Sequence, residues 1–281
     1  KAYHILSCLE NVGGELNAYT TKEETCIHAS FLKEFYNKAV ELIADIAFNS
    51  VYPENEIEKE KEVILDEINS YLDSPAEEIY DEFENNLYKG HEMGRNILGT
   101  AELVNGFTRA DICRFLKNNY STDRMVIATV GDISFEKFKN KVVTYFSEQQ
   151  RVSTTFHRTK FERLPAFNII QERNNHLSHC MMGGLSYHID SEKKVQMVLL
   201  NNILGGPGMN SRLNLNIREK YGFAYTIESQ YNAYSDTGNF SIYMGVDPQS
   251  LDKAIDLVFK ELDKLKNNRL GTVQLSNAKN Q

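Results

Sequence analysis

One order of elements is predicted twice in this 281-residue chain. Near the start, a helical pattern stops at Gly13 and Gly14, and two strands and a second helix follow, up to Ile46. Between Ile217 and Leu265 the order is again helix, glycine stop, two strands and helix. Such a recurrence suggests duplication. It predicts an α+β fold of two duplicated domains, each a mostly antiparallel sheet with helices packed on it.

Other stretches predict further elements. Residues 55–72 have the spacing of a long helix, and Asp73-Ser74-Pro75 is expected to cap the next one. The apolar runs at 125–130 and 167–171 are predicted to be strands, and 211–220 to be a helix.

A polar stretch without period near the middle of the chain is typical of a linker. We therefore expect a first domain over residues 1–150, a linker over 151–165 and a second domain over 166–281.

Composition excludes several classes of protein. Hydrophobic residues make up 41% and charged residues 25%, as in a globular chain. The net charge of -8 and the pI of about 5.5 argue against nucleic acid as a partner. No apolar run is long enough to span a membrane.

The four cysteines, Cys8, Cys26, Cys113 and Cys180, are scattered without C-x-x-C spacing. This spacing fits neither a disulfide framework nor a zinc ribbon. We expect buried free thiols in a reducing, cytoplasmic compartment, although a periplasmic or organellar protein would also fit. No leader of basic and then apolar residues precedes the first helix, so no signal peptide is expected, and the sequence looks cropped at both ends.

The helix at 55–72 carries two carboxylates in unusual places. On a helical wheel, Glu60 and Glu67 fall within the broad apolar face. Lys61 falls there too, but its long stem can reach water. A carboxylate on an apolar face must be paired, protonated or bound to a cation. Two explanations stay open: both groups reach an arginine or the edge of the stripe, or they are a metal ligand and its supporting carboxylate.

Short motifs along both halves resemble one family, the inverted-motif zinc peptidases of the insulinase, pitrilysin and mitochondrial processing peptidase type. The first half contributes the segment after the family's first zinc motif and the family's second signature. The second half contributes three motifs of the family's second domain. In order, the segments are Gly13-Gly14-Glu15-Leu16-Asn17-Ala18-Tyr19-Thr20, Glu62-Val63-Ile64-Leu65-Asp66-Glu67-Ile68, Leu204-Gly205-Gly206, Ser211-Arg212-Leu213 and Ile217-Arg218-Glu219-Lys220-Tyr221-Gly222-Phe223-Ala224-Tyr225.

The resemblance implies a role for each matching residue. Glu67 would be the third zinc ligand and Glu60 its supporting carboxylate, which makes the first domain the metal-site domain. Arg218 and Tyr225 would contact the substrate near the scissile bond, from a second domain that acts as a clamp. An edge strand would pair with the substrate backbone, at Asn17, Ala18 and Tyr19.

One departure from the family is large. The H-x-x-E-H motif, which supplies two histidine ligands and the glutamate that activates water, is absent. The resemblance places that motif and the family's first strand upstream of Lys1, and the family's last helices beyond Gln281. The chain as given is therefore expected to hold little zinc and to be inactive.

Two functions from different classes follow for the complete protein. The first is a zinc-dependent endopeptidase or oligopeptidase acting on extended peptides, which would form a homodimer or pair with a related subunit. The alternative is a non-catalytic paralogue that binds peptides or serves as partner subunit of an active peptidase. An unrelated α+β binding protein would require all the ordered motifs to be coincidence.

Overall fold

The computed structural model describes residues 2–147 and 158–280. Contacts group the chain into two compact units: unit 1 is Lys1–Ile68 with Ile97–Arg158, and unit 2 is Asn69–Asn96 with Thr159–Gln281. The boundary therefore falls inside one helix, and a segment from the first half of the sequence joins the second unit. The domain boundaries given above remain a prediction, and their linker falls partly on 148–157, outside the described residues.

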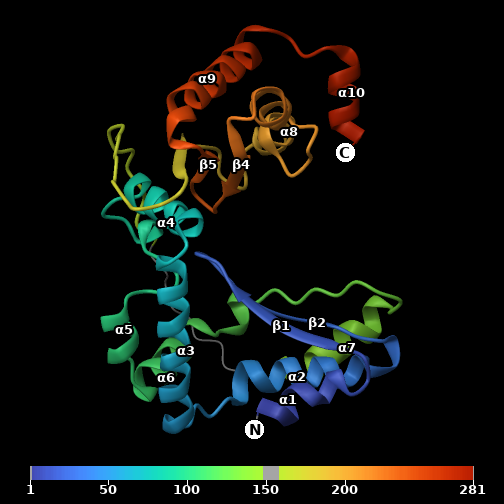
Figure 1. The fold of residues 1–281 in the computed structure, drawn as a ribbon. Helices are drawn as coiled ribbons and strands as arrows, with labels where there is room; N and C mark the ends of the chain where they lie inside the picture. Colours follow the sequence, from blue (N-terminus) through green and yellow to red (C-terminus); the bar gives the residue numbers. More distant parts are fainter. Residues whose placement is uncertain (1, 148–157, 281) are drawn as a thin grey trace. The chain divides into compact units, whose positions relative to one another are not determined.

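Unit 1 pairs a two-stranded antiparallel sheet with helices. Leu9, Ala39 and Leu42 form a core between the first helix, the hairpin and the second helix (Figure 1). The helices and strands are α1 (Ala2–Glu10), β1 (Glu15–Thr20), β2 (Thr25–Ser30), α2 (Tyr36–Asn49), α3 (Glu54–Leu72, which crosses into unit 2), α5 (Ala101–Gly106), α6 (Arg109–Asn119) and α7 (Phe135–Phe146), with short 3-10 turns at Lys33–Phe35 and Thr122–Arg124.

Unit 2 is built on a three-stranded antiparallel sheet with the order β3-β5-β4. Its elements are α4 (Pro75–Leu87), β3 (Ser178–Leu185), α8 (Lys194–Gly205), a π-helix (Asn214–Glu219), β4 (Ala224–Ala233), β5 (Gly238–Val246), α9 (Leu251–Asn267) and α10 (Thr272–Asn280), with short 3-10 turns at Glu92–Gly94 and Pro248–Ser250. None of the helices in the described ranges is long and apolar enough to cross a membrane.

The two faces of this sheet differ in chemistry. One face is apolar: Ile227, Ile242 and Met244 pack there with side chains of α8 and α9, and we call it the core face. The other face, which we call the α4 face, presents polar and aromatic side chains such as Glu228 and Tyr243 to α4. Alternation of side chains along each strand produces this division.

Most helices lie where the sequence predicts them, but two predicted strands are wrong. Residues 125–130 and 167–171 form no strand in the described part of the chain. Residues 125–130 line a groove of about 1910 Å³ together with β2, instead of pairing with it, and Val126 is 94% exposed. Apolar sequence favours an extended chain, but a strand also needs a hydrogen-bonded neighbour.

Local details also differ from expectation. Pro75 is the first residue of α4 as predicted, but Ser74 makes no side-chain capping bond. The predicted helix at 211–220 is present, with its centre in the wider π form. All four cysteines are free, yet none is buried, and Cys113 is exposed.

A buried carboxylate joins α9 to the segment before the π-helix. Glu261 is 2% exposed and accepts hydrogen bonds from Arg212 at 3.0 Å and Lys264 at 2.5 Å. Burial alone would raise the pKa of Glu261, but the bonds from Lys264 and Arg212 outweigh burial and lower the pKa below its usual value. Folding therefore favours the ionised carboxylate.

We predict that Arg212→Met lowers the free energy of unfolding of unit 2 by about 2–3 kcal/mol, because Glu261 keeps only one of its two cationic partners. Hydrogen exchange of β5 amides in rising urea measures this, with Lys266→Met on the exposed side of α9 as control. Since the folded pKa is lowered, the ion pair's contribution is present above the unfolded pKa and is lost as the pH falls through the folded pKa. Equal effects of the two variants would contradict this role.

Candidate active site

Glu60 and Glu67 lie on the exposed side of α3. No residue of α3 is buried, and Val63, which shares their side of the helix, is 58% exposed. The wheel placed both carboxylates within the apolar face, and in the structure they are exposed, as the alternative at the edge of the apolar stripe predicts. A wheel sorts residues by angle and does not say which side meets the rest of the protein. Glu60 and Glu67 are spaced two helical turns apart and open to a ligand.

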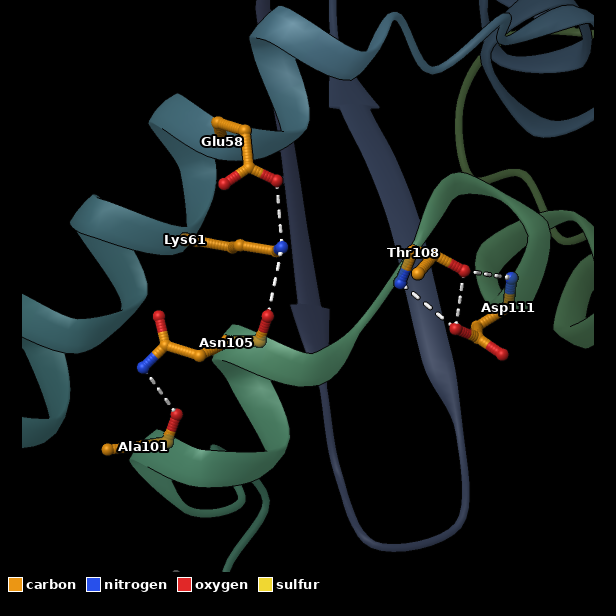
Figure 2. Close-up of polar contacts among 6 residues, drawn as sticks. All are labelled: Glu58, Lys61, Ala101, Asn105, Thr108 and Asp111. Atoms are coloured by element: carbon orange, nitrogen blue, oxygen red, sulfur yellow. Dashed lines mark hydrogen bonds and ion pairs between the residues drawn. The ribbon is translucent and has the colours of Figure 1, made fainter.

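Lys61 marks the opposite side of α3, which packs on unit 1. Figure 2 shows its ammonium between the Glu58 carboxylate at 2.8 Å and the backbone carbonyl of Asn105 at 3.2 Å. The expectation that Lys61 snorkels to water is thus wrong: its side chain is only 13% exposed and ties α3 to α5. With Lys61 turned inward, Glu60 and Glu67 are left on the exposed side of the helix.

The described residues do not complete a zinc site. They contain no group of three or more His, Cys, Asp or Glu side chains able to hold a metal ion together. Glu60 and Glu67 offer carboxylate oxygens without an imidazole or thiolate, and such a donor pair suits zinc poorly. Further ligands would have to come from outside the described residues.

The predicted substrate strand is β1, whose described partner is β2 on one edge. Tyr19 is 48% exposed, and its ring lies 6.0 Å from that of His28. The side-chain oxygen of Asn17 accepts a hydrogen bond from the backbone N–H of Ala18 at 2.8 Å. Asn17 thus occupies one backbone donor of β1 with its own side chain.

Arg218 lies in the π-helix, near its end. Its side chain is 40% exposed, and its guanidinium lies 4.0 Å from the Glu219 carboxylate. Gly222, with a φ of 66°, then turns the chain into β4. Single π turns occur frequently at functional sites, because the extra residue per turn re-aims nearby side chains.

Tyr225 occupies a β-bulge at the start of β4. The register passes from Ala224 opposite Val246 to Thr226 opposite Gly245, so Tyr225 is the extra residue. Ala224 and Ile227 are both buried although they are three apart, whereas Tyr225 is 65% exposed. A regular strand would direct Tyr225 to the same face as Ile227, into the core, and the bulge prevents this. Bulges commonly re-aim a side chain next to an active site.

The structure sorts the predicted residues into two sets. Asn17, Glu60 and Glu67 belong to unit 1, while Arg218 and Tyr225 flank the Gly222 turn of unit 2. Sequence reasoning missed the polar contacts on the α4 face, because α4 reads as an ordinary amphipathic helix.

Two family profiles match the chain. Residues 1–101 match the profile described as Insulinase (Peptidase family M16), and residues 106–281 match the profile described as Peptidase M16 inactive domain. An uncharacterized zinc protease of Bacillus subtilis is 32% identical over 282 residues, which cover 100% of this chain and 68% of the relative. One from Rickettsia felis is 34% identical over 264 residues, which cover 93% and 62%. The chain spans between 55% and 68% of the length of such curated relatives.

Solved structures resemble the chain along most of its length. A protease from Helicobacter pylori matches with a TM-score of 0.86 at 22% identity, covering 96% of this chain and 67% of that one. A chain of complex III2 from Candida albicans matches with a TM-score of 0.81 at 17% identity, covering 98% and 70%. At these identities the likeness shows the fold alone. The profiles and the curated relatives show that this chain belongs to the peptidase M16 (insulinase) family.

Proposed function

We propose that the complete protein is a zinc-dependent endopeptidase that hydrolyses peptide bonds in extended peptides. The observation that carries this proposal is the bulge in β4, which leaves Tyr225 65% exposed although Ala224 before it and Ile227 after it are buried. An exposed tyrosine at a strand irregularity costs packing, and a hydroxyl that must reach a substrate accounts for that cost. The zinc protease relatives give the reaction class.

The residues of this chain would bind and orient the substrate. The hydroxyl of Tyr225 would donate a hydrogen bond to the carbonyl oxygen that becomes negatively charged in the transition state. Arg218 would grip the substrate backbone through its guanidinium. Zinc supplies Lewis-acid chemistry in such enzymes. Glu67, with Glu60 in support, would give it one ligand and the upstream H-x-x-E-H the others.

The substrate would add to β1 as a further strand. Backbone pairing of this kind binds extended peptides regardless of most side chains. A substrate carbonyl beside β1 would compete with the Asn17 side chain for the N–H of Ala18. The substrate carbonyl would replace the Asn17 side chain as the acceptor of this hydrogen bond. The N–H of Ala18 would therefore stay paired when the substrate binds.

The groove beside β2 fits the same proposal. β2 and the extended residues 125–130 both line this groove, and residues 125–130 form no strand in the described part of the chain. We infer that in the complete protein the family's first strand fills this groove and gives 125–130 the neighbour it lacks among the described residues. Val126 would then be covered.

A non-catalytic partner subunit is the second candidate. Two observations favour it: the inactive-domain profile matches residues 106–281, and a chain of complex III2 shares the fold. The gene sequence upstream of Lys1 separates the two functions. An intact H-x-x-E-H supports the peptidase, and a degenerate one supports the partner subunit.

We predict that Glu67→Gln strips zinc from the complete protein, because an amide is a weaker ligand than a carboxylate. Elemental analysis should find about one zinc per chain in the wild type and in Glu62→Gln, a matched change elsewhere on α3. Full zinc occupancy in Glu67→Gln would make Glu67 an ordinary surface carboxylate.

We predict that Tyr225→Phe lowers kcat of the complete protein on the order of a hundredfold, since one oxyanion donor is lost. The exposed ring is retained, so thermal unfolding should be unchanged. Tyr187→Phe removes another partly exposed hydroxyl of unit 2 and serves as control. Wild-type turnover in a folded Tyr225→Phe variant would exclude the proposed role.

A further inference from the structure

The bulge that exposes Tyr225 needs support on the side of the sheet away from the core. Tyr225 and Thr226 are both exposed, so neither is fixed by packing of its own. Ile227 anchors β4 to the core face, and Glu228 is the next residue that faces α4. A contact that holds the Glu228 side chain therefore also holds the backbone of β4 in place immediately after the bulge.

α4 supplies that support through one hydroxyl. Tyr80 donates a hydrogen bond from its hydroxyl to the Glu228 carboxylate at 2.6 Å, and Gln230 donates to the same oxygen at 3.2 Å. Burial, and then the hydrogen bond to Glu228, raise the pKa of Tyr80 far above its ordinary value, so the hydroxyl remains a donor across the neutral range. A short bond to a charged acceptor is stronger than one between neutral groups.

The ring of Tyr80 is itself held in place. It lies 5.3 Å from the ring of Tyr243, which is the register partner of Glu228 on the central strand. The Tyr243 hydroxyl is bonded to His179 on β3 at 2.9 Å. Tyr80 thus contacts β4 and β5 directly, and its ring partner Tyr243 is bonded in turn to β3, which holds the Tyr80 hydroxyl in position.

We propose that Tyr80 and Glu228 are positioning residues that hold the bulge of β4 so that Tyr225 points out of the sheet. The proposal rests on the function proposed above for Tyr225. Other described side-chain bonds between α4 and the sheet reach its far end, where Glu84 accepts from Tyr234 and Asn239. Only Asp73 and Ser74 separate α4 from α3, so the stretch of chain that provides Glu67 also provides the support for Tyr225.

A fluorine probe tests the proposal without reference to activity. With 3-fluorotyrosine at position 225 of the 281-residue chain, Tyr80→Phe should move the ¹⁹F resonance toward the value of an unfolded peptide and narrow it. Tyr231→Phe is the matched control, because it removes another 2.6 Å tyrosine hydrogen bond, to the Tyr187 carbonyl, from the distal half of β4. An unchanged resonance in Tyr80→Phe, or an equal change in both variants, would overturn the proposal.

Kinetics of the complete protein give the second readout. Tyr80→Phe should lower kcat on the order of tenfold with little change in KM, and Glu228→Gln, which keeps an acceptor oxygen, should lose less. In a Tyr225→Phe background, Tyr80→Phe should have no further effect on kcat, because its action passes through Tyr225. If the losses in kcat of Tyr80→Phe and Tyr225→Phe add up in the double variant, Tyr80 does not act through Tyr225, and its contact with Glu228 only stabilises the fold. If the wild type hydrolyses no peptide, the proposed function fails while the fluorine result still decides whether Tyr80 positions Tyr225.

Discussion

β5 is hydrogen-bonded to a neighbour on both edges, and the architecture of unit 2 depends on this central position. A strand paired on both sides must direct its side chains to the two faces alone. Met244 and Ile242 then enter the apolar core, while Tyr243 turns to α4. The bulge falls on β4, which is paired on one edge among the described residues, so an extra residue can be accommodated there without breaking the centre of the sheet.

Local signals predicted those parts of the fold that depend on neighbours in sequence. Gly13 and Gly222 end helical segments with φ values of 74° and 66°, which only glycine adopts easily, and hairpins follow both. The segments at 125–130 and 167–171 also carry apolar residues typical of strands, but neither forms a strand in the described chain. An apolar segment becomes a strand only if a second segment, which can be distant in sequence, hydrogen-bonds to it. The sequence of the first segment does not show whether such a partner exists.

For the candidate site residues, too, the sequence alone did not predict contacts with distant parts of the chain. Family motifs singled out Glu67 and Tyr225 as candidate site residues, but the structural surroundings of these two residues could not be predicted. Lys61 looked like a residue that reaches water and is instead bonded to the Asn105 carbonyl, because α5 lies there. The bulge at Tyr225 has no signature of its own, since it is defined by the register against β5. Tyr80 was missed because its partner, Glu228, is distant in sequence.

The hydrogen bond from the Ala18 N–H to the Asn17 side chain has a consequence for contacts between copies of the protein. A strand edge with unpaired backbone donors can pair with the same edge of another molecule, and such pairing commonly starts aggregation. The side chain of Asn17 accepts a hydrogen bond from one such donor, the N–H of Ala18, so this donor is already paired within the strand itself. A replacement such as Asn17→Val would leave that N–H idle and would favour association between copies at high concentration. The asparagine thereby reduces the number of unpaired backbone donors on an exposed strand edge.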